Sequence, residues 1–306
     1  MPKVVYIAGW GRSGSTLLDQ ILGQAEGWFS CGELNFAWHN FSCGCGAAVH
    51  ECDFWGPVLG RVTGRDPARS PDRLIDLRRA HLGASPRELL AIRRARRAGA
   101  HGSPHRFYAE VMRDLYSEIA DASGARVIVD SSKLATDAYV ISTLTDVDLR
   151  VVHLVRDPRA TAHSWARSRR KDPALQLDMG KLGPAASSVY WLRRNAVIEA
   201  LLRPRLRARY VRVRYEDLVA DPRATAEALC AFAGEPGARL PFVDRHKIRL
   251  NGNHMVGGNP RRFDSGMTDV RADDEWRRGM ARKPRVLASL PALPLSSRYG
   301  YSLTGR

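Results

Sequence analysis

The apolar residues of this chain gather in short runs that predict buried strands. Residues 4–8 are all apolar and rich in β-branched side chains, as expected of a strand inside a protein core. Runs at residues 125–129, 149–155 and 210–214 predict three further strands, and residues 28–30 predict a short one. These strands stand between segments of helical periodicity, so the chain is expected to fold as an α/β domain.

Helical spacing of apolar residues fills much of the rest of the chain. Residues 15–22 repeat apolar positions at the intervals of an amphipathic helix, and residues 184–202 predict a long helix. The tail, residues 274–301, predicts one terminal helix and a packed C-terminus. A mainly helical region is expected over residues 53–122, from apolar stripes at residues 55–62, 74–77, 89–92 and 111–119.

The first strand and the first helix are joined by a loop dense in glycine, positive charge and hydroxyl groups. Its residues of these kinds are Gly9, Gly11, Gly14, Arg12, Ser13, Ser15 and Thr16. Such a loop presents backbone N–H groups at a helix N-terminus, where the helix dipole is positive, and phosphate is the usual occupant. A plain glycine turn is the structural alternative, but the density of phosphate-binding groups favours a phosphate site.

The loop departs from the P-loop of nucleotide hydrolases at one position. Gly9 and Gly14 fit the glycine spacing of that pattern, but Ser15 stands where its lysine belongs. Because that lysine reaches the β- and γ-phosphates of ATP or GTP, hydrolysis of these nucleotides is disfavoured. A P-loop kinase or NTPase-like phosphotransferase stays open as an alternative function. The cation of this loop is Arg12 instead.

Charged residues also follow the ends of three other predicted strands. Glu33 comes directly after a glycine at the end of the short strand, and Lys133 closes the polar run Asp-Ser-Ser-Lys after residues 125–129. Arg156 ends the strand at residues 149–155, and Ser164 follows it by eight positions. Ligands of α/β proteins bind at such strand ends. An arginine fork beside a hydroxyl suits a terminal phosphate dianion.

In this order, these residues resemble those of the sulfotransferases that use 3′-phosphoadenosine 5′-phosphosulfate (PAPS) as sulfuryl donor. The 5′-phosphosulfate loop of that family reads roughly (K/R)-S-G-(T/S)-T-L. This chain matches it throughout with Arg12, Ser13, Gly14, Ser15, Thr16 and Leu17. The family also binds the 3′-phosphate through an arginine and a serine with the spacing of Arg156 and Ser164.

Two later segments extend the resemblance to the nucleotide. A Tyr-Glu-Asp-Leu motif after a strand is typical of the family, and its tyrosine, here Tyr215, contacts adenine. A late basic loop that contains glycine covers the nucleotide in the family. The resemblance implies that role for Gly257, Gly258, Asn259 and Arg261 or Arg262.

Two residues resemble catalytic positions of the tyrosyl-protein sulfotransferases. In those enzymes a Cys-Gly-Glu triplet stands at nearly the same distance from the loop arginine as Glu33 stands from Arg12, and a glutamate there acts as general base. Lys133 is similar to the lysine that contacts the sulfuryl group, and the catalytic histidine of the cytosolic branch has no counterpart here. The structural alternative for Glu33 is a solvated acid or one in the first turn of a helix.

The resemblance covers nearly the whole chain and implies its fold and its reaction. The fold is an α/β three-layer sandwich with a central parallel sheet, the P-loop NTPase-like sulfotransferase fold, in a single domain of residues 1–306. Residues 35–122 form a mostly helical insertion on the acceptor side. The reaction transfers the sulfuryl group of PAPS to a hydroxyl or amine and releases adenosine 3′,5′-bisphosphate. The implied catalytic residues are Arg12, Glu33 and Lys133, and no metal is required.

Composition adds a strong positive charge and few other constraints. The chain has 306 residues, of which 44% are hydrophobic, and a net charge of +16, which attracts polyanions. A basic nucleic-acid-binding protein without catalysis is therefore a second alternative, but no nucleic-acid-reading module is recognisable, so no specific nucleic acid is expected. The acceptor is expected to be a small molecule, glycan or lipid.

The location of the protein is predicted from what the sequence lacks. No apolar run has the length of a transmembrane helix, and the N-terminus is a core strand rather than a signal peptide. We therefore expect a cytoplasmic protein without a transmembrane segment. The sequence does not indicate its oligomeric state.

The cysteines form one cluster that allows three interpretations. Cys43, Cys45 and Cys52 lie close together in the sequence, with His50 between them. These four residues supply the number of ligands that zinc needs, although their spacing fits no common zinc pattern. A disulfide from Cys52 to one of the other two is the second interpretation, but disulfides are uncommon in the cytosol. We prefer the third, a tight turn with reduced thiols and a structural role.

Overall fold

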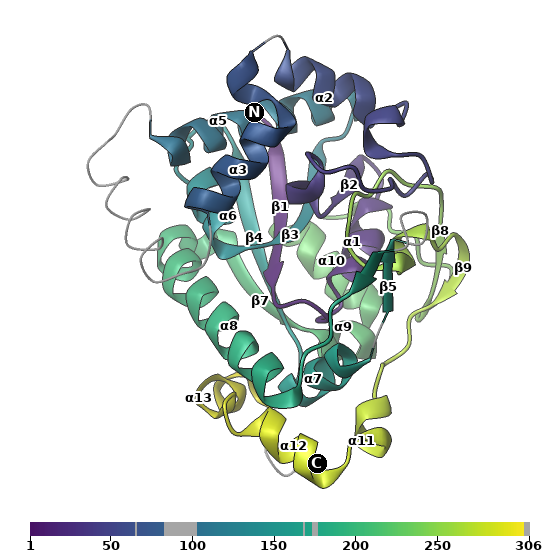
Figure 1. Ribbon diagram of the computed structural model, residues 1–306. Coiled ribbons are helices and arrows are strands. Elements are labelled where there is room, and N and C mark those ends of the chain that lie inside the picture. Colours follow the sequence, from purple (N-terminus) through teal and green to yellow (C-terminus); the bar gives the residue numbers. More distant parts are fainter. Residues whose placement is uncertain (65, 83–102, 168, 173–176, 303–306) are drawn as a thin grey trace.

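The five predicted strands form one parallel sheet. The computed structural model describes residues 1–64, 66–82, 103–167, 169–172 and 177–302. The strands lie in the order β2-β3-β1-β4-β7 (Figure 1). Their bounds are Lys3–Gly9 (β1), Trp28–Gly32 (β2), Val127–Lys133 (β3), Asp148–Val155 (β4) and Tyr210–Arg214 (β7). Because β1 is central, the glycine-rich loop that follows it opens at the middle of the sheet edge.

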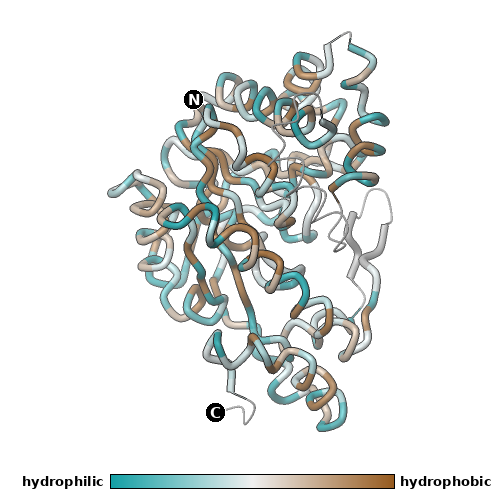
Figure 2. Tube along the Cα trace, turned by 90° about the vertical axis from the view of Figure 1, so that its left-hand side faces the viewer, coloured by the Kyte–Doolittle hydropathy of each residue, from teal (hydrophilic) through white to brown (hydrophobic). Residues whose placement is uncertain are grey.

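Helices cover both faces of this sheet. One face carries α2 (Trp55–Thr63), α5 (Pro104–Ser123), α6 (Ala135–Ile141) and α8 (Pro184–Leu206), and α3 (Pro71–His81) packs on α5. The opposite face carries α1 (Ser15–Gly23), α9 (Tyr215–Ala220) and α10 (Pro222–Phe232). Figure 2 shows the hydrophobic strands enclosed between these helices. The three-layer α/β sandwich expected from the sequence is confirmed.

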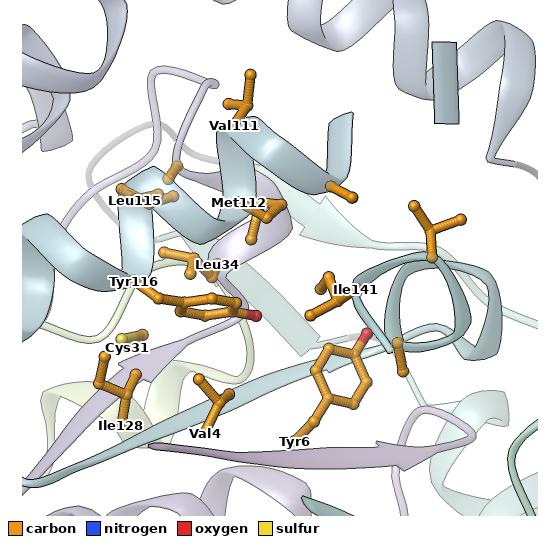
Figure 3. Packing of buried hydrophobic residues seen from close by; sticks show 14 of the residues in the cluster. Val4, Tyr6, Cys31, Leu34, Val111, Met112, Leu115, Tyr116, Ile128 and Ile141 are labelled. Carbon is orange, nitrogen blue, oxygen red and sulfur yellow. The ribbon is translucent and has the colours of Figure 1, made fainter. Parts of the chain in front are cut away.

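The alternation of side chains along β1 creates the two cores. Val4 and Tyr6 point into the core beneath α5 and α6, and Val5 and Ile7 point into the core beneath α1. Successive side chains of a strand face opposite ways, so an entirely apolar strand is buried on both faces. Figure 3 shows the first of these cores, with Tyr116 of α5 lying close above the sheet.

β3 continues farther than its apolar residues indicate. The sequence predicts a strand over residues 125–129, but pairing with β1 extends to Lys133. The polar residues stay in the sheet because their side chains find buried partners. Asp130 accepts hydrogen bonds from Tyr116 Oη (2.6 Å) and Ser132 Oγ (2.5 Å). The strand therefore delivers Lys133 directly to the edge of the sheet.

The junction between β4 and α7 (Pro158–Ala166) forms at an Asp-Pro pair. Asp157 caps the helix by accepting a hydrogen bond from the backbone N–H of Arg159 (2.8 Å), and Pro158 occupies the first helical position. His153 in β4 is fully buried between Tyr210 Oη and Asn195 Oδ1, each at 2.7 Å. Burial lowers the pKa of His153 to about 4, so this histidine packs in its neutral form.

Several short elements were not predicted. Two antiparallel hairpins pair β5 (Arg169–Asp172) with β6 (Leu177–Met179) and β8 (Lys247–Leu250) with β9 (Gly266–Asp269). Their strands of three or four residues are too short to show a hydrophobic pattern. The single terminal helix predicted for the tail is wrong, because the chain forms α11 (Glu275–Gly279), α12 (Arg282–Ser289) and α13 (Leu293–Ser296). The helical stripe at residues 89–92 lies outside the described residues.

None of the described helices has the length and apolar content needed to cross a membrane. The longest, α8, contains four arginines. It also continues past the predicted end at residue 202 to Leu206, through Pro204.

A buried carboxyl group ties α1 to the sheet behind the glycine-rich loop. Asp19 accepts hydrogen bonds from Ser30 Oγ of β2 and Ser131 Oγ of β3, both at 2.5 Å. Burial raises the pKa of Asp19 to about 7, against a usual value of 3.8, and the two serine hydrogen bonds oppose that rise. The ionised form of Asp19 therefore destabilises the folded protein relative to the protonated form.

We expect Asp19→Asn to gain stability relative to the parent as the pH rises. Between pH 4 and 7 the folded parent binds a proton that the unfolded chain has released, so its stability falls with increasing pH. An asparagine keeps both serine contacts without this titration, and the difference should reach roughly 4 kcal/mol at most. Urea unfolding followed by circular dichroism at pH 5 and pH 8 measures it. Asp121→Asn, at an exposed position of α5, is the control, and identical pH profiles for parent and Asp19→Asn would contradict the assignment.

Candidate active site

A cavity of about 580 Å³ opens at the carboxyl edge of the sheet. Residues at or just after the ends of all five strands line it, as expected for a ligand site of an open α/β sheet. The predicted site residues that line it are Arg12, Gly14, Ser15, Thr16, Leu17, Glu33, Lys133, Arg156, Ser164, Tyr215, Asn259 and Arg261. The tertiary structure therefore gathers residues from the first loop and from positions more than 240 residues later.

Three predicted residues stand behind the lining of this cavity. Ser13 is buried, with 1% of its surface exposed. Gly257 and Gly258 both have positive φ angles, and a Cβ atom at Gly258 would lie 3.1 Å from Glu33 Oε1 and 3.7 Å from Thr16 Oγ1. The late glycine loop therefore packs directly on Glu33 and beside the first loop.

The first loop takes an uncommon backbone conformation. Arg12 has a φ of 70° and Gly14, the N-cap of α1, has a φ of 90°. A Cβ atom at Gly14 would lie 2.5 Å from Cδ2 of the Tyr215 ring. Glycine is thus required at this position both for the backbone angle and for the close approach of Tyr215. A non-glycine residue with positive φ, as at Arg12, costs about 1–3 kcal/mol and is typical of functional sites.

Arg156 links the first loop to the C-terminal part of the chain. Its Nη1 donates to the carbonyl oxygen of Arg12 (3.1 Å), and its Nη2 donates to that of Asp273 (2.6 Å). The carboxylate of Asp273 lies 3.1 Å from Nη2, and the guanidinium stacks 4.3 Å from the centre of the Tyr215 ring. Ser164 of α7 is buried and lines the same cavity. The predicted residues Arg156 and Ser164 therefore line the same cavity.

Glu33 and Lys133 form an ion pair on the β3 side of the first loop, whereas Arg156 follows β4 on the other side. Glu33 Oε1 and Lys133 Nζ are 2.6 Å apart, and both side chains are about one-seventh exposed, at 15% and 14%. Lys133 has a φ of 73° at the end of β3, a second uncommon backbone angle in the site. The backbone N–H of Glu33 donates to Val256 O (2.7 Å), which attaches it to the late loop.

A model of the sulfotransferase family matches residues 2–239. The chain belongs to the sulfotransferase family. Carbohydrate sulfotransferase 2 of Mus musculus is 30% identical over 190 residues, which cover 50% of this chain and 35% of that protein. Human carbohydrate sulfotransferase 6 is 38% identical over 100 residues, which cover 29% of this chain and 25% of that protein. The alignments thus span about a quarter to a third of the curated relatives.

Solved structures show the same fold over nearly the whole sulfotransferase chain. The sulfotransferase domain of the Synechococcus PCC 7002 olefin synthase superposes with a TM-score of 0.52 and 22% identity, covering 98% of this chain and 96% of that domain. The sulfotransferase domain of the curacin biosynthetic pathway gives a TM-score of 0.54 and 19% identity, with 99% of both chains covered. At these identities the likeness concerns the fold.

The lining of the cavity is strongly cationic. Seven of its lining residues are arginine or lysine and two are acidic. Sequence reasoning missed several of these residues, among them Arg78, Arg194 and Asp273. Arg78 pairs with the buried Asp137 at 3.2 Å, and burial lowers the pKa of Arg194. Arg78 and Arg194 lie within helices and gave no signal of a site in the sequence, because only the packing of α3 and α8 brings them to the cavity.

An aromatic wall was missed for the same reason. The Trp10 ring stacks between Trp165 of α7 (centroids 5.3 Å apart) and Tyr190 of α8 (5.5 Å). The indole N–H of Trp165 donates to Gly11 O at 3.2 Å, and the Arg12 guanidinium lies 5.1 Å from the Trp165 ring. This wall supports the glycine-rich loop from the side of the long helix.

We expect Gly14→Ala to lower the urea midpoint of unfolding, with a loss of about 1–3 kcal/mol from the positive φ alone. The added methyl group also meets the Tyr215 ring. Gly60→Ala is the matched control, because Gly60 lies in α2 with nothing within 4 Å of its Cβ position, and alanine there should be neutral or stabilising. Equal midpoints for Gly14→Ala and the parent would show that the loop does not need its left-handed turn.

Proposed function

We propose that this protein transfers the sulfuryl group of PAPS to a hydroxyl or amine of an acceptor and releases adenosine 3′,5′-bisphosphate. One observation carries the proposal. A single cavity is lined by a phosphate-type loop, by Arg156 and Ser164, and by the carboxylate–lysine ion pair of Glu33 and Lys133. Neither a kinase nor a nucleic-acid-binding protein requires these three features together.

Buried polar atoms in the site support an anionic ligand. Within the part of the chain that the structure describes, Arg156 Nε and Ser13 Oγ are buried and have no hydrogen-bond partner. Buried donors of this kind are costly unless a ligand satisfies them. Asp273 offsets part of the charge of Arg156, but Arg167 Nη2 also lies 3.9 Å from its carboxylate, so the group keeps a net positive charge. These residues fit a phosphate.

The proposed contacts of PAPS follow from the resemblance. Residues 12–17 would hold the 5′-phosphosulfate, Arg156 with Ser164 the 3′-phosphate, and Tyr215 the adenine. The late loop would cover the nucleotide with Gly257, Gly258, Asn259 and Arg261. Asn259 and Arg261 line the cavity, and Gly258 packs against Glu33, which supports this role.

The chemistry proposed for the protein is proton removal and charge stabilisation. PAPS supplies an activated sulfuryl group: a bond forms from the acceptor oxygen or nitrogen to sulfur while the bond from sulfur to the 5′-phosphate oxygen breaks. Glu33 takes the proton of the acceptor. Lys133 stabilises negative charge on the sulfuryl oxygens, and Arg12 with the loop N–H groups stabilises the leaving phosphate. The 2.6 Å ion pair holds the base and the lysine at one point.

The acceptor side is proposed to come from residues 35–122. Asn35, Phe36 and Arg78 line the cavity on the side of Glu33 and Lys133, which supports this assignment. The names of the curated relatives make a carbohydrate hydroxyl the first acceptor class to test. Incubation with ³⁵S-labelled PAPS and a panel of sugars, phenols, lipids and amines identifies the acceptor.

Calorimetric titration with adenosine 3′,5′-bisphosphate tests the donor site without an acceptor. We expect binding that weakens at least about tenfold in Arg156→Ala, because a charge-assisted bidentate contact is lost. Arg156→Lys keeps the charge but not the fork and should also bind more weakly. Arg61→Ala, an exposed arginine of α2, is the control. Binding of ATP–Mg²⁺ with indifference to the bisphosphate would instead favour the phosphotransferase.

The second test concerns the base. Glu33→Gln should reduce sulfuryl transfer by about 10²–10⁴-fold, the usual contribution of a general base, and should keep its affinity for adenosine 3′,5′-bisphosphate. The exposed Glu227→Gln of α10 should behave as the parent. Transfer at the parental rate by Glu33→Gln would remove Glu33 from the mechanism without affecting the donor site.

A further inference from the structure

Three cysteines and one histidine from opposite ends of the chain meet beside the cavity. Cys43, Cys45 and Cys52 come from the segment after β2, and His254 from the segment after β8. Their three sulfur atoms and one imidazole nitrogen all lie within 4.8 Å of one another. None of these side chains has a part in the proposed transfer reaction.

Four of the six distances within this cluster are close to those of a tetrahedral metal site. The Sγ atom of Cys52 lies 3.7 Å from those of Cys43 and Cys45. His254 Nδ1 lies 3.3 Å from Cys52 Sγ and 3.6 Å from Cys43 Sγ. In a tetrahedral zinc site with Zn–S of about 2.3 Å and Zn–N of about 2.0 Å, the S···S edges are about 3.8 Å and the S···N edges about 3.5 Å. These four edges agree with the ideal ones within a few tenths of an ångström, and the two remaining edges, from Cys45 to Cys43 and to His254, are at most 4.8 Å long.

We propose that Cys43, Cys45, Cys52 and His254 bind one zinc ion as a structural Cys₃His site. A disulfide does not account for the cluster, because bonded sulfur atoms lie about 2.05 Å apart and all three cysteines are free. Thiolate and imidazole are ligands that suit zinc rather than magnesium or calcium. Four protein ligands close the coordination sphere, as in structural rather than catalytic zinc sites.

The surroundings of the cluster hold its ligands in place. The His254 ring stacks on Phe54 with centroids 5.2 Å apart, and Trp55 Nε1 donates to the His254 carbonyl oxygen at 2.6 Å. The backbone N–H of Cys45 hydrogen-bonds to the sulfur of Cys43 and helps to orient it. Gly46, with a φ of 94°, completes the tight turn that returns the chain toward Cys43. Cys43 and Cys52 are buried, while Cys45 is exposed and gives a metal access.

The ion would join the late glycine loop to the segment that carries Glu33, the proposed general base. Cys43 forms a bridge with Val256, and the N–H of Gly44 donates to Met255 O at 2.9 Å. Val256 in turn exchanges backbone hydrogen bonds with the β2 end, donating to Cys31 O (2.8 Å) and accepting from Glu33 N (2.7 Å). A metal bound to His254 therefore anchors the segment that leads directly to Gly257 and Gly258.

One of the four zinc ligands considered from the sequence, His50, is not a ligand in the structure. His50, the histidine nearest the cysteines in the sequence, is exposed in the short helix η2 (Val49–Glu51) and is not part of the cluster. His254 takes its place from 202 positions after Cys52. With this partner the zinc interpretation is preferred over the reduced thiols expected from the sequence.

Metal analysis of the full chain, purified from cells grown with zinc, tests the site independently of catalysis. We expect about one zinc per chain in the parent. His254→Ala should reduce the zinc content about tenfold or more, and His50→Ala and Cys230→Ser should retain it. His254→Cys should also retain zinc, since four thiolates form a stable tetrahedral site. This variant keeps the test informative if His254→Ala fails to fold.

Two further measurements separate a bound metal from free thiols. Cobalt substituted into the parent should show the intense visible bands of tetrahedral thiolate coordination. Removal of zinc by a strong chelator should lower the temperature of unfolding. Three results would each overturn the proposal. The first is a parent that stays folded and equally stable after its metal has been removed. The others are equal zinc contents in His50→Ala and His254→Ala, or a native mass that is lower by two hydrogen atoms because a disulfide has formed.

Discussion

The left-handed turn between β1 and α1 is the constraint on which the rest of the site depends. Gly14 lacks a Cβ atom, so the ring of Tyr215, the first residue of α9 after the edge strand β7, comes into contact with the loop. The carbonyl oxygen of Arg12 accepts a hydrogen bond from Arg156, which brings the end of β4 to the same place. One loop conformation thus aligns three strand ends, and because β1 is central, it does so at the middle of the sheet edge.

The positive charge of the site is balanced by few acids. Seven basic and two acidic residues line the cavity, and Asp273 and Glu33 each pair with one of the cations. Partly buried like charges repel one another and are poorly solvated. An anion that binds among them relieves the repulsion and replaces the missing solvation, so both effects favour its binding. In a chain with a net charge of +16, this cavity is therefore a place where positive charge is concentrated.

The late glycine loop and the cysteine segment form one unit with the end of β2. Backbone hydrogen bonds of Val256 join this loop to Cys31 and Glu33, and the cluster around His254 lies directly beside them. Irregular segments bury little apolar surface and depend on such local ties for their order. The position of Glu33 is therefore set from two sides, by the sheet through Lys133 and by the loop through Val256.

The sequence by itself determined the sheet, the glycine-rich loop and the helix caps, because apolar runs, glycine spacing and Asp-Pro junctions act over a few neighbouring residues. It also indicated Arg12, Arg156 and Lys133, since polar residues at strand ends gather at one edge. The roles of these residues and the single domain of residues 1–306 stay predictions. Only the tertiary structure decided that Arg78, Arg194 and Asp273 reach the cavity and that His254, rather than His50, joins the cysteines. These partners are far apart in the sequence, and only the packing of distant segments brings them together.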